Sequence, residues 1–166
     1  IFTADHHVYD LPPLLSWNVR HTGTVPCDSW SVTAVYQPEM LTVLRMAAGF
    51  AAIENGMTQL RGIVDEYTVE LGSRGMTVTL SGRGYAARLL DNESRPVTYE
   101  QVTLRELVRC HAEPYGISCG AAADLRSTVP YTAEAGISQW KVISEFCRTY
   151  GGFLPRFAKT GELLAT

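Results

Sequence analysis

The sequence of 166 residues lacks several features that assign a chain quickly to a class of protein. It has no apolar run that approaches the roughly 18 residues of a membrane span, and its start lacks the basic and apolar regions of a signal peptide. Its formal net charge of −3 offers no basic surface for neutralising phosphates, so we expect no specific nucleic-acid binding. With 46% hydrophobic and 19% charged residues, the composition is typical of a folded protein.

Motifs for metal binding and redox chemistry are also missing. No two of the four cysteines form a C-x-x-C pair, and no histidine is spaced with them like a metal ligand. Cys110 and Cys147 fall within helical patterns, where a reduced cysteine behaves as a small apolar residue, so we expect both to be buried. We therefore expect no metal, no cofactor and folding in a reducing, intracellular compartment.

One short stretch has the pattern of a cofactor-binding turn. The segment TLSGRGYAARLLDN, residues 79–92, places Gly82, Gly84 and Ala87 in the order G-x-G-x-x-A. A dinucleotide-binding turn follows a buried parallel strand, which reads as a continuous apolar run, but the preceding MTVTLS alternates apolar and polar residues. The acidic residue at a suitable distance, Glu100, precedes a helix rather than ending a strand. The sequence therefore argues against a dinucleotide site.

We interpret the same stretch as structural. The two glycines allow the chain to leave the sheet sharply. Residues 85–92 are then expected to form a short helix or turn that packs Leu89 and Leu90 onto the end of a barrel. Arg83 is expected to hydrogen-bond a neighbouring loop or a neighbouring subunit.

The first part of the chain, residues 1–96, has mostly the two-residue period of β-strands. Asn55-Gly56 separates two extended runs and suits a type I′ hairpin turn, and Gly62 marks a bulge or a bend. YTVEL and MTVTLS then form a hairpin with one apolar and one polar face. Roughly five to seven antiparallel strands predict a small barrel or sandwich.

Further along the chain, over residues 97–166, the period becomes helical. Thr103 and Glu106 form a capping box, and Ser138 caps a second helix that ends at a Gly-Gly pair. The final segment, FLPRFAKTGELLAT, reads as a hairpin whose second strand is cut short. We therefore predict a small α+β domain of two helix–strand units, truncated at its C-terminus.

The two helical segments match at an offset of 35 residues, with Thr103 opposite Ser138 and Gly116 opposite Gly151. Two copies are too few for a solenoid repeat. The match indicates either two related helix–strand units or only the sequence rules that helix caps share.

Three segments taken together, VTLSGRGYAARLLDN, TLRELVRCHAEPYGI and ISQWKVISEFCRTYGGFLPRFAKTGELL, resemble the baseplate hub proteins of phage tails. These are late-control-D-like and prophage tail proteins, related to the hubs of contractile injection systems. In that family a strand ends in an S-G-R-D-like turn, matched here at residues 81–83, and a G-x-V-D segment follows the hairpin, matched at residues 62–65. The resemblance covers roughly residues 28–164, and Gly84 stands where the family usually has an acidic residue.

The resemblance implies an N-terminal split β-barrel followed by a small α+β domain. Related hubs are homotrimers whose barrels form a ring of pseudo-equivalent domains, and the ring joins the tail tube to the spike or central fibre. The protein would then belong to the virion tail, assembled in the bacterial cytoplasm. Since the inner wall of such a ring faces the passing genome, a polar or mildly acidic lumen would avoid trapping DNA.

The polar face of the predicted hairpin is the candidate for that inner wall. Thr68 and Glu70 lie on one strand and Thr77 and Thr79 on the other, and all four are expected on the same face. A plain solvated face is the alternative. Together with Arg83, these four are the candidate interface or lumen residues.

No catalytic arrangement emerges, so we expect no enzyme. Asp65 and Glu66 are consecutive and would point to opposite faces of a strand, and a G-x-S-x-G elbow is missing. The alternative to a structural hub is a receptor- or carbohydrate-binding module of a bacterial surface or phage protein. Such a module would use exposed aromatic residues such as Trp17, Trp30 and Tyr131, whereas a hub would bury its tryptophans in a core or an interface.

Overall fold

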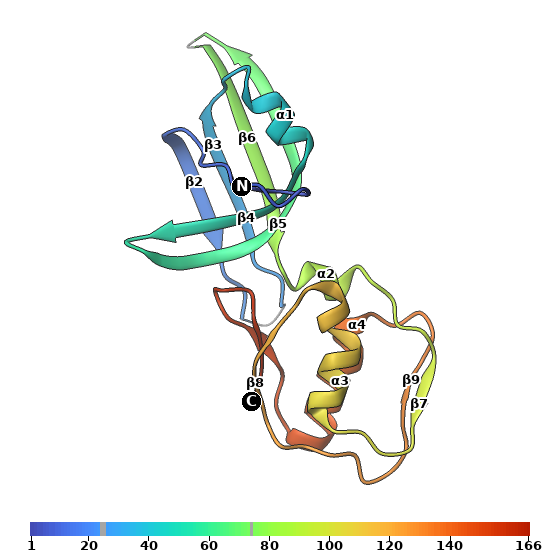
Figure 1. Cartoon of the computed structure of the whole chain (residues 1–166). Coiled ribbons are helices and arrows are strands. Elements are labelled where there is room, and N and C mark those ends of the chain that lie inside the picture. Colours follow the sequence, from blue (N-terminus) through green and yellow to red (C-terminus); the bar gives the residue numbers. More distant parts are fainter. Residues whose placement is uncertain (24–25, 74) are drawn as a thin grey trace. The chain divides into compact units, whose positions relative to one another are not determined.

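A computed structural model describes residues 1–23, 26–73 and 75–166 (Figure 1). The chain divides into two compact units, Ile1–Gly84 and Tyr85–Thr166, and each is described by itself. The first unit consists mainly of antiparallel strands, and the second combines helices with short strands. The predicted α+β class is therefore confirmed.

The first unit is a six-stranded sheet with one short helix. The strand order is β1-β4-β5-β6-β3-β2, and every neighbouring pair is antiparallel. Among the described residues no hydrogen-bonded pair joins β1 to β2, and the β2 edge stays open, whereas residues 7–9 are hydrogen-bonded to the outer side of β1. The elements are β1 (Phe2–Thr3), β2 (Leu14–Arg20), β3 (Ser29–Val35), α1 (Met40–Arg45), β4 (Ala47–Glu54), β5 (Met57–Gly72) and β6 (Gly75–Gly84).

Strand β5 belongs to two hairpins at once. Its first part pairs with β4 and its second part with β6, and the two pairings overlap at Gly62 and Ile63. A bulge or bend was expected at Gly62, but Gly62 is regularly paired and the β-bulge lies between Val64 and Glu66, where it shifts the register. The predicted hairpin turn is confirmed, because Asn55 and Gly56 have positive φ angles of 51° and 76° between β4 and β5.

The core of the first unit follows from the alternation along its central strands. Trp30 stacks on Phe50 with ring centroids 3.8 Å apart, and α1 contributes Met40 and Leu44, which are both buried. Strands β3 and β6 bury every second side chain, and the apolar ones are Trp30, Val32, Ala34, Val78 and Leu80. The side chains between them face the other side of the sheet.

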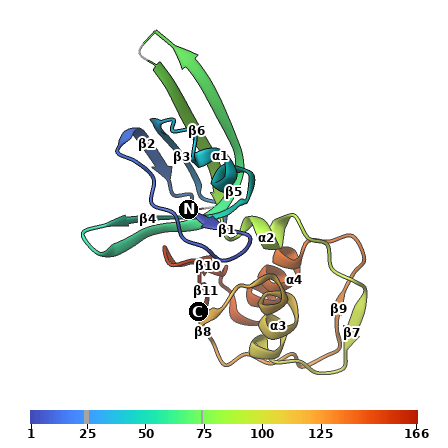
Figure 2. The same ribbon diagram turned by 45° about the horizontal axis from the view of Figure 1, so that its top comes forward.

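The second unit packs two eight-residue helices, α3 and α4, beside two small sheets (Figure 2). One sheet has the order β10-β11-β8, with β11 antiparallel to β10 and parallel to β8, and the other pairs β7 with β9. The helices are α2 (Ala87–Leu90), α3 (Leu104–His111), the 3-10 turn η1 (Glu113–Tyr115), α4 (Gln139–Phe146) and the π-helical turn η2 (Cys147–Gly151). The strands are β7 (Val97–Tyr99), β8 (Cys119–Ala122), β9 (Tyr131–Ala133), β10 (Arg156–Phe157) and β11 (Leu163–Ala165).

Both predicted helix caps are present. The backbone N–H of Glu106 donates to Thr103 Oγ1, and the Glu106 carboxylate accepts from the Thr103 backbone N–H, which completes the capping box. At the start of α4 the Lys141 backbone N–H donates to Ser138 Oγ over 3.2 Å. Each contact satisfies a backbone group that the first turn of a helix leaves unpaired.

The 35-residue correspondence holds for both helices and fails at the glycines that follow them. Helices α3 and α4 each have eight residues and begin 35 positions apart. After α3 the left-handed residue is Gly116, with φ 72°, whereas after α4 it is Gly152, with φ 70°, rather than the predicted Gly151. The π-helical turn η2, which follows α4 alone, accounts for this shift because its wider ring takes up an extra residue.

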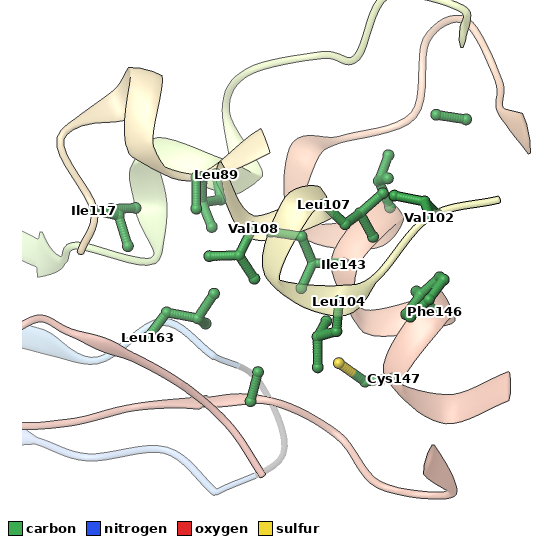
Figure 3. Packing of buried hydrophobic residues seen from close by; sticks show 14 residues of the cluster. Leu89, Val102, Leu104, Leu107, Val108, Ile117, Ile143, Phe146, Cys147 and Leu163 are labelled. Carbon is green, nitrogen blue, oxygen red and sulfur yellow. The ribbon is translucent and has the colours of Figure 1, made fainter. Parts of the chain in front are cut away.

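The second unit has a core of its own, which also receives α2 (Figure 3). Leu89 is fully buried there with Leu107 and Ile143, so the expectation that it packs onto the end of a barrel is wrong. The unit accordingly begins at Tyr85, whereas the pattern change predicted a boundary after residue 96. The physical reason is that α2 packs against α4, a contact that sequence periodicity does not reveal.

The cysteines differ from one another in environment. Cys147 is buried in the second core as predicted, but Cys110 is exposed on α3, so that expectation is wrong. Among residues 1–23, 26–73 and 75–166, no three His, Cys, Asp or Glu side chains gather into a group suited to a metal ion. No helix in the same part of the chain is long and apolar enough to cross a membrane.

Candidate functional surface

The face of the first sheet opposite its core carries rows of hydroxyl and acidic side chains, which we call the hydroxyl face. The strand register places Thr68 opposite Thr79 and Glu70 opposite Thr77, so the four predicted residues share this face. The register extends the rows over β3 and β2 with Thr33, Ser31, Ser16 and Asn18, and over the bulge with Ser81 and Glu66.

Hydrogen bonds join neighbouring strands across the hydroxyl face. Thr33 Oγ1 and Thr79 Oγ1 lie 3.0 Å apart, and Ser81 Oγ donates to Glu66 Oε1 over 3.0 Å. Thr68 and Glu70 are exposed, and Thr79 is half-buried between its neighbours. The side chains are therefore held in place and still meet solvent.

The charges on this face are few and mostly acidic or paired. Glu66 and Glu70 supply negative charge, and the rows contain no lysine. Of the arginines on the described strands of this face, Arg20 lies at the end of the edge strand β2, Arg61 lies over the Phe2 ring, and Arg83 is bound to a carboxylate. A polyanion such as DNA would meet hydroxyl groups on this surface and few free positive charges that could bind its phosphates.

Arg83 makes a two-pronged ion pair with Asp65. Its Nε and Nη2 atoms donate to the two carboxylate oxygens over 2.8 and 2.9 Å. Asp65 is the extra residue of the β5 bulge, which aims its side chain at β6. The predicted contact to a neighbouring loop is thus made within the chain by the adjacent strand, and a contact to another subunit stays a prediction. Arg83 and Asp65 belong to separate sequence motifs, and neither motif predicts a contact between them.

Gly62 and Gly82 allow the strands beside this pair to approach closely. A Cβ on Gly82 would lie 2.0 Å from the Ile63 carbonyl oxygen, and a Cβ on Gly62 would lie 2.2 Å from that of Arg83. The same Ile63 oxygen accepts a hydrogen bond of 3.1 Å from Trp30 Nε1. The glycine pattern therefore serves strand packing.

The chain leaves the sheet directly after this glycine pattern. Gly82 and Gly84 both lie within β6, and the Gly84 N–H donates to the Asp28 carbonyl over 2.8 Å. Gly84 is the last residue of β6, and a turn at residues 85–86 leads into α2, so the expected exit into a short helix is confirmed. The helix that follows has only four residues.

Strand β2 forms an open and unusually apolar edge of the sheet. Six of its seven residues are exposed, among them Leu14 and Leu15. Trp17 is 66% exposed although it stands opposite Val32 on the apolar face, whereas Trp30 is 3% exposed. Unpaired strand edges with exposed apolar side chains are typical of surfaces that pair with another chain.

The two hairpins of β5 also end in exposed apolar side chains. Leu71 and Met76 stand opposite each other near the end of the β5–β6 hairpin, and Leu71 is 81% exposed. Ile53 and Met57 lie at the end of the β4–β5 hairpin and are 67% and 65% exposed. The apolar surface of the first unit is therefore concentrated at its strand edge and hairpin ends.

Comparison with known proteins finds similarity in structure alone. No protein-family model matches the chain, and no curated protein matches it. The structure is similar to the tail protein from Neisseria meningitidis MC58, with 16% identity and a TM-score of 0.72 over 89% of this chain and 45% of that one. It is also similar to the 43 kDa tail protein of prophage MuSo2 from Shewanella oneidensis, with 18% identity and a TM-score of 0.63 over 84% of this chain and 46% of that one.

A third similar structure is the c3393 protein of E. coli, a component of the type VI secretion system described as structurally similar to bacteriophage tail proteins. It is 11% identical, with a TM-score of 0.52 over 90% of this chain and 47% of that one. The chain spans less than half the length of each of these three proteins. At such low identity the likeness concerns the fold, and the chain has the fold of phage tail and type VI secretion proteins.

Proposed function

We propose that the chain is a structural component of a phage or phage-like tail, within the baseplate hub. In this role it forms a homotrimeric ring that joins the tail tube to the spike or fibre, in a virion tail assembled in the bacterial cytoplasm. The observation that carries the proposal is a sheet with one lysine-free hydroxyl face and an open apolar edge, in a fold shared with tail proteins.

The open edge of β2 supports assembly into a ring. Leu15 and Trp17 expose apolar surface beside unpaired backbone groups, and both kinds of group are stabilised when another subunit covers them. A ring of subunits joins unlike edges head to tail and closes when the rotation allows it.

The hydroxyl face supports a lumen. Thr68, Glu70, Thr77 and Thr79 would line the wall of the ring, where a passing nucleic acid meets hydroxyl groups and carboxylates instead of free cations. Each lysine or arginine that neutralises a phosphate strengthens DNA binding, so a wall with few basic residues would bind the passing DNA only weakly. Arg83 adds no free cation because Asp65 neutralises it.

A structural role without catalysis is part of this proposal. The carboxylates that stand next to each other in sequence are both engaged, Asp65 with Arg83 and Glu66 with Ser81. General acid–base chemistry needs a carboxyl group that is free to exchange a proton with a substrate.

A receptor- or carbohydrate-binding module remains the second candidate because Trp17 is exposed. The two functions differ in what happens to Trp17 when the protein concentration rises. In a ring, Trp17 becomes inaccessible to a soluble quencher of fluorescence, whereas in a binding module it stays accessible until a ligand is added.

The test measures molar mass by light scattering over a wide concentration range, with acrylamide quenching in parallel. We expect a trimer with a protected Trp17, and we expect Trp17→Glu to remain monomeric. Val129→Glu is the matched control, since Val129 is 59% exposed in the second unit and has no part in the sheet edge. A monomer at every concentration, also with tail tube and spike proteins added, would overturn the hub assignment.

A further inference from the structure

A groove runs between α3 and β8 in the second unit, with a volume of about 870 Å³. The helix lines one side with Arg105 and Arg109, and Glu113 follows after the helix. Residues 118–122 line the other side. The groove has no part in the sheet edge or in the hydroxyl face of the first unit.

The strand side of the groove is an open sheet edge. In the three-stranded sheet β8 pairs with β11 alone, and no strand of the described residues pairs with its other edge. Its side chains are small, since the sequence from 118 to 122 is SCGAA. Edge backbone N–H and C=O groups can pair with a further strand, and small side chains leave room for the side chains of that strand.

The helix side carries two positive charges one turn apart. Arg105 and Arg109 are both exposed, and no ion pair to either guanidinium occurs among the described residues. Glu106 is occupied by the helix cap, where it accepts from the Thr103 N–H and Oγ1 over 2.9 and 2.8 Å. The two arginines are therefore available to a carboxylate from outside the chain.

The arginine side chains also lie near the strand. Burial raises the pKa of the Cys119 thiol, and the positive charge of Arg105 partly opposes that rise. Arg105 and Cys119, the first residue of β8, both line the groove. A strand added at this edge would pass within reach of the same charge.

The spacing of the arginines fits an extended segment. Residues four apart on a helix are separated by about 6 Å along its axis. Alternate side chains on a strand are about 6.6 Å apart and point to the same side. Two acidic residues separated by one position would therefore reach Arg105 and Arg109 together.

We propose that this groove binds an extended acidic segment of another protein, which adds to the sheet beside β8 and places carboxylates on Arg105 and Arg109. The strand hydrogen bonds supply affinity that depends little on sequence, and the two arginines select an acidic-x-acidic pattern. This docking function is independent of the ring proposed for the first unit.

The experiment uses the full chain and a capped hexapeptide, threonine-glutamate-threonine-glutamate-threonine-valine. Binding is followed by isothermal titration, and amide hydrogen exchange of residues 119–122 reports where the peptide lies. We expect slower exchange in β8 on binding, and at least about tenfold weaker binding to Arg105→Glu/Arg109→Glu. The matched control is Arg148→Glu/Arg156→Glu, which makes the same change in net charge at two other exposed arginines of this unit.

Four outcomes would overturn the proposal. The first is no binding up to about 1 mM, a concentration that corresponds to about −4 kcal/mol. The second is equal binding of a peptide with lysine in place of glutamate, and the third is equal binding to both double variants. The fourth is concentration-dependent self-association that protects β8 and disappears in Arg105→Glu/Arg109→Glu, because the occupant is then a second copy of the chain. Trp17→Glu should leave peptide binding unchanged, so failure of the ring and failure of the groove are distinguishable.

Discussion

Replacing Gly82 by alanine tests the close approach of β5 and β6 beside the Arg83–Asp65 pair. The new Cβ would lie 2.0 Å from the Ile63 carbonyl oxygen and 2.9 Å from the Trp30 ring. Contacts of a Cβ below 3.0 Å essentially do not occur, so the two strands must separate by about 1 Å or more. That movement breaks the local hydrogen bonds of the ladder and displaces the bulge.

The expected loss in the free energy of unfolding is about 3 kcal/mol or more, the upper range for overpacking, because backbone atoms form the obstacle. For a unit of the size of Ile1–Gly84, 1 kcal/mol corresponds to roughly 4–8 °C in Tm. The transition of the first unit should therefore fall by about 12–24 °C in differential scanning calorimetry.

Gly72→Ala in the same hairpin is the matched control. Its Cβ would meet no atom closer than the Gly75 carbonyl oxygen at 3.8 Å, which is an ordinary contact. Because alanine leaves the unfolded chain fewer conformations than glycine does, the free energy of unfolding should stay unchanged or rise by up to about 1 kcal/mol. If Gly82→Ala unfolds within about 0.5 kcal/mol of the parent chain, the strands are further apart than described and the packing explanation of the glycine pattern fails.

Four further predictions concern the second unit and the proposed lumen. Gln139→Leu should cost about 1–3 kcal/mol in chemical denaturation, because buried His111 then loses the partner that lies 2.6 Å from its Nδ1; an unchanged midpoint would contradict the network. Thr103→Ala should cost about 1 kcal/mol through loss of the capping box, with Thr103→Ser as the control that keeps it. Burial raises the pKa of Tyr131 to about 12 from 10.0, so the buried neutral phenol stabilises the fold fully below pH 10 and this stabilisation is lost as the pH rises to 12. Tyr131→Phe should therefore reduce the fall in the free energy of unfolding between pH 10 and pH 12. An unaltered slope over that range would refute the prediction. Thr79→Lys should slow DNA release from particles built with the variant while Thr79→Ser does not, and equal rates would remove the lumen assignment.

Features set by neighbours in sequence were predictable. The Asn55-Gly56 turn and the Thr103 and Ser138 caps depend on residues at most a few positions apart, and the structure has all three. The alternation of β6 likewise sorts its side chains between core and hydroxyl face, because a strand has a fixed two-residue period.

Features set by contacts across the chain were not predictable. Arg83 meets Asp65 because a bulge re-aims a side chain 18 residues away, and no local pattern fixes which residue a bulge displaces. Leu89 was placed with the wrong core for a related reason, since its burial depends on α4, far along the chain. Cys110 is exposed because the buried residues of α3 share one face, and at 3.6 residues per turn position 110 is rotated away from that face.

The 16-residue strand β5 gives the first unit a continuous mechanical element. At about 3.3 Å per residue it has a contour of about 53 Å, and one covalent backbone passes through both hairpins. A pull on the β4–β5 turn along this strand loads the β5–β6 ladder in shear, so its hydrogen bonds share the force instead of opening one after another. The Arg83–Asp65 pair links β5 to β6 at the bulge and so adds a side-chain contact to the ladder that carries the load.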